Sequence, residues 1–150
     1  MGARGMGLGA LVAATLAVSG CGGSSPKPLT HAELIAKANA ICKTVSAKLA
    51  TKTVKSVQDL VRIAPELASF EQTALTELSK LVPPADLESD WKTFVAGAEK
   101  LAENTAKLGE DVKSKNIKAA HALVLTTEKT TQQMLAIAKR DGFKHCEQAP

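Results

Sequence analysis

The stretch DLESDWKTFVAGAEKLAENTAKLGEDV, residues 86–112, decides the fold class of this chain. Mostly apolar residues form a stripe in it and recur at alternating spacings of four and three. This heptad-like pattern is typical of a helix packed at a shallow angle on its neighbours. The members of the stripe are Leu87, Trp91, Phe94, Ala98, Leu101, Thr105, Leu108 and Val112. We therefore expect a long amphipathic helix here, with Asp86 as its N-cap.

Two further helices carry clear end signals. The first, from about residue 31 to residue 52, follows Thr30 and Glu33, which are spaced as a capping box. The last follows Asn116, which can cap its start. It ends before Gly142, a residue type that commonly terminates helices. Both segments have one apolar face, so we expect each to bury one side.

The segment between these helices is less regular. Its stripe shows a drift in the middle and consists of Leu60, Ala64, Leu67, Ala74, Leu78 and Leu81. It begins near Ser56 or Asp59, and Pro65 interrupts it. Because proline is tolerated only in the first turn of a helix, this predicts either a short helix before a longer one that starts near Ala64, or one helix that kinks.

The connections between these segments are short. With one apolar stripe on each, the pattern predicts an all-α, up-down-up-down four-helix bundle over residues 30–150. In that topology the first and last helices are antiparallel neighbours. The composition agrees, because Ala, Leu, Lys and Glu dominate and favour helix.

Charge and aromatic content exclude one class of function. The chain has a formal net charge of +4, no Tyr, one Trp and three Phe. Proteins that bind single-stranded nucleic acid stack bases on exposed aromatic residues among basic ones. That interleaving is absent, so we expect no nucleic-acid partner.

The amino-terminal region has the layout of a secretory signal. Arg4 precedes a short apolar stretch, and residues 18–20 (VSG) lead into Cys21. This resembles the lipobox of bacterial lipoproteins, in which the signal is cut before a cysteine that carries diacylglycerol. We predict a signal peptide at residues 1–20, lipidation of Cys21, and a flexible tether at residues 21–29. The alternatives are an ordinary secretory signal or a short membrane span, although a span needs about 20 apolar residues.

Cys42 and Cys146 are the remaining cysteines. We predict that they form a disulfide joining the first helix to the carboxyl-terminal tail, because the space outside the cytoplasmic membrane permits such bonds. The alternatives are two free thiols or a metal pair. Two cysteines so far apart without a C-x-x-C motif make a poor metal signature.

Four short motifs resemble a group of uncharacterised small actinobacterial lipoproteins. They are A-N-A-I-C at residues 38–42, the L-V-P-P-A turn at residues 81–85, Trp91, and G-F-K-H-C at residues 142–146. The resemblance implies a helical fold with the two cysteines paired and an extracytoplasmic location. It implies no activity.

Few residues suggest chemistry. His31, His121 and His145 stand in no metal-binding pair, and the acids are expected on solvent faces. Met134 is expected in the core.

Two patterns are unusual. The first is a basic segment whose lysines could attract anionic lipid or an acidic wall polymer, or could simply form a solvated face; they are Lys37, Lys43, Lys48, Lys52 and Lys55. The second is a threonine cluster that could leave a polar gap, form a groove for a partner, or bond back to the helix; it consists of Thr126, Thr127, Thr130 and Thr131.

These observations predict a lipoprotein on the outer side of the cell membrane, anchored by lipid on Cys21. We expect a non-catalytic binding or interaction module, with an envelope protein or an anionic wall polymer as partner and without metal or cofactor. The alternative is a carrier of a small ligand or metal, which requires a cavity of roughly several hundred Å³ between the helices. An enzyme is the third hypothesis, and it requires polar groups that converge in one cleft.

Overall fold

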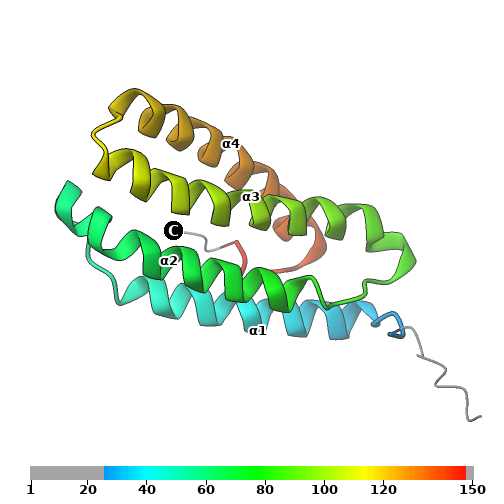
Figure 1. The fold of residues 1–150 in the computed structure, drawn as a ribbon. Coiled ribbons are helices and arrows are strands. Elements are labelled where there is room, and N and C mark those ends of the chain that lie inside the picture. The colour runs from blue at the N-terminus through cyan, green and yellow to red at the C-terminus, as the bar shows by residue number, and fades with distance from the viewer. Residues whose placement is uncertain (1–25, 148–150) are drawn as a thin grey trace, which may run out of the picture.

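The computed structural model describes residues 26–147 and shows an all-α fold (Figure 1). This part of the chain contains four α-helices and one 3-10 turn, and it has no strand. The helices are α1 (His31–Ala50), α2 (Val57–Leu78), α3 (Glu88–Lys113) and α4 (Ile117–Asp141), and the turn η1 (Ala85–Leu87) precedes α3. The predicted four-helix bundle is confirmed. The predicted signal peptide, Cys21 and most of the predicted tether lie outside the described residues.

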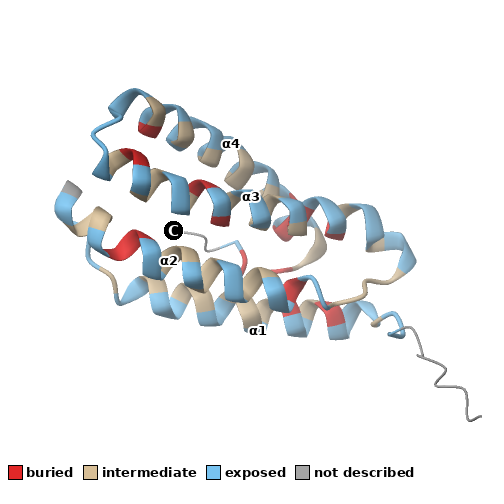
Figure 2. Cartoon of the chain, in the orientation of Figure 1, coloured by how far each residue is buried: buried red, intermediate tan, exposed pale blue. Residues whose placement is uncertain are grey.

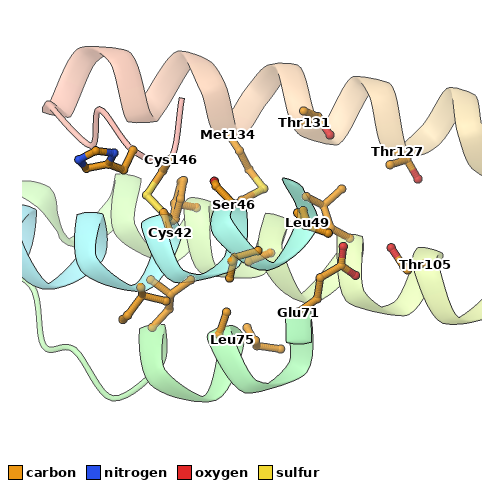
Figure 3. Close-up of a pocket in the computed structure, with 18 residues that line it drawn as sticks. Cys42, Ser46, Leu49, Glu71, Leu75, Thr105, Thr127, Thr131, Met134 and Cys146 are labelled. Atoms are coloured by element: carbon orange, nitrogen blue, oxygen red, sulfur yellow. A yellow bond between two sulfur atoms is a disulfide. The ribbon is translucent and has the colours of Figure 1, made fainter. Parts of the chain in front are cut away.

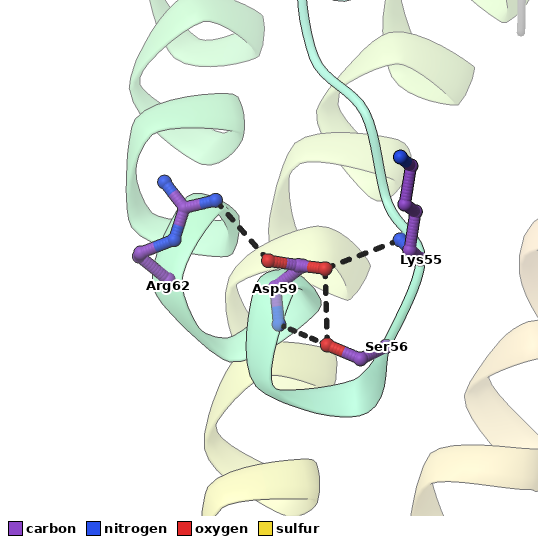
Figure 4. Close-up of polar contacts among 4 residues, drawn as sticks. All are labelled: Lys55, Ser56, Asp59 and Arg62. Carbon is purple, nitrogen blue, oxygen red and sulfur yellow. Dashed lines mark hydrogen bonds and ion pairs between the residues drawn. The ribbon is translucent and has the colours of Figure 1, made fainter.

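The predicted starts of α1 and α2 are confirmed in atomic detail. The Glu33 N–H donates to Thr30 Oγ1 over 3.3 Å, and the Thr30 N–H donates to Glu33 Oε2 over 2.8 Å, which completes the capping box. At α2 the Asp59 N–H donates to Ser56 Oγ over 3.1 Å (Figure 4). Hydrogen bonds from the Ser56 hydroxyl, from the Lys55 N–H and from Arg62 hold the pKa of the Asp59 carboxyl below its usual range.

Pro65 does not divide the second segment. α2 runs unbroken from Val57 to Leu78 with Pro65 inside it, so the expectation of two helices is wrong. The proline is exposed, whereas its neighbours Ile63 and Ala64 are buried. A Cβ placed on Gly109 of α3 would lie 2.8 Å from the Cβ of Ala64, so the two helices approach very closely here. Tertiary packing therefore offsets the cost of the proline.

Asp86 is not the N-cap of α3, which corrects the sequence-based prediction. The chain enters α3 through η1, and the residue before the helix, Leu87, makes no side-chain cap. Asp86 lies inside η1, and its Oδ2 atom lies 2.7 Å from Nε2 of His31. Asp86 therefore links the turn to the start of α1. In the connection between α3 and α4, Asn116 caps the start of α4 as predicted. Gly142 ends α4 with φ +84°.

The hydrophobic core cluster lies where the carboxyl-terminal tail folds back onto the helices, and further buried positions lie toward the other end of α2, α3 and α4 (Figure 2). Trp91, Phe94 and Phe143 form the centre of the core cluster, with ring centroids 5.6 to 5.8 Å apart. Leu34 and Ala138 pack on this cluster and are fully buried. Leu29, the last residue of the predicted tether, also packs here and donates its N–H to the Val82 carbonyl over 2.9 Å.

The bundle closes unevenly. α2 packs closely on α3, and α3 packs closely on α4, whereas α1 contacts α2 more sparsely. Within residues 26–147, no comparable contact joins α1 directly to α4. The tail that follows Gly142 lies instead between the pair formed by α1 and α2 and the pair formed by α3 and α4 (Figure 1). The expected adjacency of the first and last helices is therefore made through the tail, and the helices leave space beyond it.

Candidate binding pocket

A pocket of about 280 Å³ lies between the helices, next to the end of the tail (Figure 3). All four helices contribute to it, and it is partly open to solvent. The apolar wall consists of Ile41, Val45 and Leu49 from α1, Ala74, Leu75 and Leu78 from α2, Phe94, Ala98 and Leu101 from α3, and Met134 from α4. Because several facing positions hold small side chains, the helices cannot fill the space between them.

The helix register gives the pocket a direction. α2 and α3 are antiparallel, so the seven residues from Leu78 back to Glu71 on α2 run beside the seven from Phe94 to Leu101 on α3. Thr105 lies about one turn beyond Leu101. Seven residues separate Glu71 from Leu78, which is roughly 10 Å along a helix axis. Figure 3 shows the disulfide at one end of this span and the carboxyl and threonine hydroxyl groups at the other.

The disulfide end is held by the tail. Cys42 and Cys146 are bonded, with their Cα atoms 5.1 Å apart, which confirms the predicted disulfide. The His145 N–H donates to Asn39 Oδ1 over 2.9 Å, and this contact fixes the tail on α1. A bonded cysteine cannot serve as a thiolate ligand. Among residues 26–147 no group of three or more His, Cys, Asp or Glu side chains is placed to hold a metal ion.

The opposite end is polar. Glu71 from α2, Thr105 from α3, and Thr127 and Thr131 from α4 line it. The buried side chain of Asn104 donates to Thr127 Oγ1 over 3.0 Å. This bond fixes the position of the Thr127 oxygen. The hydroxyl hydrogen of Thr127 is not used in it and can be donated to another acceptor.

Glu71 is the charged pocket residue that sequence analysis missed. The α2 stripe drifted because a position was skipped: Leu67, Glu71 and Ala74 continue the alternation of four and three residues. The carboxyl group therefore stands on the inward face, against the expectation that acids lie on solvent faces. An acid at a heptad core position was the signal that could have revealed it.

The environment of Glu71 is unfavourable for a charge. Its Oε2 atom is buried and accepts no hydrogen bond from the residues that the structure describes. Burial raises the pKa of the carboxyl group above its usual range, and the hydroxyl of Thr105 offsets part of this effect. Glu71 forms no salt bridge with any Lys, Arg or His side chain of residues 26–147.

The threonine cluster divides between two roles. The hydroxyls of Thr126 and Thr130 donate to carbonyls one turn earlier, those of Ala122 and Thr126, each over 3.0 Å. Thr127 and Thr131 line the pocket. Thr126 and Thr130 therefore fit the back-bonding hypothesis, and Thr127 and Thr131 fit the hypothesis of a polar gap. Met134 lines the same pocket and packs against the core as expected.

The remaining candidate residues do not come together. His31 pairs with Asp86, His121 is exposed, and the exposed His145 lines the pocket at its disulfide end. Two of the basic lysines, one on α1 and one just after it, are engaged with α2. Lys48 Nζ lies 4.3 Å from the ring centroid of Phe70, and Lys52 Nζ lies 2.7 Å from Glu66 Oε1.

Three comparisons with known proteins were made. No family model matches the chain, and neither the curated proteins nor the solved structures give a match. The resemblance to small actinobacterial lipoproteins therefore stays a prediction. The fold and the pocket define the class: a disulfide-closed, all-α four-helix bundle with an apolar pocket between its helices. None of the helices in residues 26–147 combines the length and apolarity needed to cross a membrane.

Proposed function

We propose that this protein is an extracytoplasmic lipoprotein that binds a small, mainly apolar ligand in the pocket between its helices, without catalysing a reaction. The single observation that supports this function best is the cavity of about 280 Å³ with apolar walls. Pockets for drug-sized ligands begin at about 300 Å³. The size therefore favours a compact ligand, and the pocket favours the carrier hypothesis over a module that acts only through its surface.

The arrangement of ionisable groups supports a binding role over catalysis. Glu71 and His145 are the ionisable residues that line the pocket, and they lie at its polar end and its disulfide end respectively. General acid–base catalysis needs such groups within hydrogen-bond reach of the same reacting atoms. A ligand in this pocket would therefore meet one carboxyl group, several hydroxyls and an apolar wall.

The membrane anchor is the second part of the proposal, and the sequence supports it. Cys21 lies outside residues 26–147, and the tether before Leu29 can span about 25 Å at most. The test is palmitate labelling of the wild type and of Cys21→Ala in cells. Label on the wild type and none on the variant supports the anchor, whereas equal labelling contradicts it. An envelope protein or wall polymer as partner stays a prediction.

A neutral dye tests the pocket. N-phenyl-1-naphthylamine carries no charge at neutral pH, and its fluorescence rises in apolar surroundings. We expect saturable binding to the full-length chain carrying Cys21→Ser, which removes the acylation site and the need for a membrane in the assay. Adding Ala98→Leu fills the pocket and should weaken binding about tenfold, which corresponds to about 1.4 kcal/mol.

Ala96→Leu is the matched control. Ala96 lies on α3 two residues before Ala98, but it is exposed and does not line the pocket. It adds the same side chain to the same helix, so it should leave dye binding unchanged. Absence of saturable binding, or equal weakening by both substitutions, contradicts the proposed function.

A further inference from the structure

Glu71 is out of place for a residue that only supports the fold. The other members of its stripe on α2 are apolar, so the position is one at which a helix usually buries an apolar side chain. A buried carboxyl group without a partner costs free energy, because it loses the hydrogen bonds that water supplied. In Glu71 the Oε2 atom is buried and has no hydrogen-bond partner among the described residues.

No cation of the described chain compensates for Glu71. Two basic side chains from the end of α1 and the loop after it are directed to other partners on α2: Lys48 lies over the ring of Phe70, and Lys52 pairs with Glu66. The residues that line the pocket include neither Lys nor Arg. The pocket therefore presents one acidic group at the end of an apolar channel, and its charge is complementary to a cation that arrives with the ligand.

The surrounding hydroxyls suit the same ligand chemistry. An alkylammonium head has several N–H donors and no acceptor, so it needs several oxygen atoms around it. Figure 3 shows the carboxyl group of Glu71 and the hydroxyl groups of Thr105, Thr127 and Thr131 at the same end of the pocket. The oxygen of Thr127 is held in place by Asn104. From this end the apolar wall continues toward Leu78 and Phe94, over roughly 10 Å.

We infer that the ligand is a small organic amine, with its ammonium group at Glu71 and its apolar body lying along the channel toward Leu78 and Phe94. This inference rests on the proposed binding function and names the chemical class of the ligand. The ammonium group supplies the partner that Oε2 of Glu71 lacks. A hydrogen bond between two charged groups in a partly buried site is stronger than one between neutral groups.

Three probes with the same alkyl body and different heads test the inference. Heptylamine is cationic, 1-heptanol is neutral and heptanoate is anionic at neutral pH. Each competes with N-phenyl-1-naphthylamine for the full-length chain carrying Cys21→Ser. We expect heptylamine to displace the dye at a concentration about tenfold lower than 1-heptanol does, and heptanoate to be the weakest.

Glu71→Gln keeps the shape of the side chain and removes its charge. In this variant heptylamine should lose its advantage of about tenfold, while the affinity for the neutral dye stays within about twofold. Glu77→Gln is the matched control, because Glu77 lies on the same helix but is exposed and outside this pocket. It should leave the order of the three probes unchanged.

The outcomes separate this inference from the proposed function. If the dye binds but 1-heptanol or heptanoate competes as well as heptylamine, the pocket exists and the amine inference is wrong. The same holds if Glu71→Gln leaves the advantage of heptylamine intact. If the dye does not bind to the wild-type pocket, the proposed function itself fails. Loss of dye binding in Glu71→Gln alone would assign the residue a structural role and also overturn the inference.

Discussion

The two ends of the bundle interior are built from the same helices but are filled differently. At the aromatic end, Trp91, Phe94 and Phe143 pack against one another with centroids less than 6 Å apart. At the polar end, the same helices contribute Glu71, Thr105, Thr127 and Thr131, and these side chains surround a cavity. Packing density in a protein core contributes directly to stability. The comparison indicates that the aromatic end stabilises the fold, whereas the cavity at the polar end forgoes that packing.

The tail makes this division possible. Phe143 enters the space between the helix pairs, and the disulfide to Cys42 holds the tail beside α1. Beyond Cys146 no described side chain of the tail continues into the pocket. The aromatic end is therefore completed by a segment outside the helices, and the polar end is left open to a ligand.

The largest expected effect is at the aromatic end. Phe143→Ala removes a side chain that is 1% exposed and leaves a cavity, so the free energy of unfolding should fall by about 3 to 5 kcal/mol. Urea denaturation measures this change. Leu125→Ala on α4 is the control, because Leu125 is 55% exposed and its loss should cost less than about 0.5 kcal/mol. Equal effects of the two substitutions would contradict the division of the interior.

The disulfide should have the next largest effect. It closes a loop over a sequence separation of 104 residues, and the double variant Cys42→Ala, Cys146→Ala should lower the free energy of unfolding by about 2 to 4 kcal/mol. Urea denaturation with and without reductant measures this. Reductant should destabilise the wild type and leave the double variant unchanged. A wild type that resists denaturation equally in both conditions would remove the disulfide from this account.

The smallest effect has the opposite sign and distinguishes the polar end most sharply. Glu71→Gln should stabilise the protein by roughly 1 kcal/mol near neutral pH, because it removes the charge of a half-buried carboxylate whose Oε2 atom is buried without a hydrogen-bond partner. Denaturant titration measures the difference from the wild type. A loss of stability would show that the carboxylate supports the fold, which the comparison between the two ends excludes.

The pH dependence of that difference follows from the sign of the shift. Burial raises the pKa of Glu71 in the folded state above the value of 4.5 for a free carboxyl group, so the folded state binds the proton more tightly. The contribution of Glu71 to stability is therefore greatest below that value and declines as pH rises through the raised pKa. The gain in Glu71→Gln should therefore be smallest below pH 4.5 and should grow as pH rises through the raised pKa.

Other acids must be separated from this measurement. The pKa values of Glu33 and Asp59 are lowered by the hydrogen bonds of their helix caps, chiefly from Thr30 and Ser56, so their contributions fall as pH falls. They act in both the wild type and the variant. The difference between the two proteins therefore isolates Glu71. A gain that does not change with pH would contradict the assignment.

Local signals were sufficient to predict much of the fold. Thr30, Ser56 and Asn116 cap helices because their side-chain oxygens accept from backbone N–H groups only a few residues away. Gly142 ends α4 because a positive φ is easy for glycine. These interactions depend on neighbours in the chain, so the pattern of residue types predicts them.

Interactions between distant segments were harder to predict. Asp86 had the correct residue type and position for a cap, yet it pairs with His31, which lies 55 residues away. Pro65 was expected either to divide α2 or to kink it, but α2 is a single helix, and Ala64 beside the proline approaches Gly109 of α3 closely. In both cases a contact across the bundle outweighs a local preference, and no pattern within one segment contains that contact.

The candidate site shows the same limit. The disulfide between Cys42 and Cys146 was predictable, because the chain offers few other partners for either thiol. Glu71 was missed because an acid in a helical stripe is usually exposed at its edge. Its inward position depends on how α1, α3 and α4 surround α2 at that level, which the stripe of α2 alone does not specify.

The amino-acid sequence alone determined the helical class, the number of long helices, most of their ends and the pairing of the two cysteines. Short-range hydrogen bonding and the 3.6-residue period act within each segment, so these features can be read in order along the chain. Only the tertiary structure decided that the tail separates α1 from α4, which end of the interior is filled, and that Glu71 faces a pocket. Those features arise from the sizes of side chains that meet from four helices, and packing of this kind depends on all of them together.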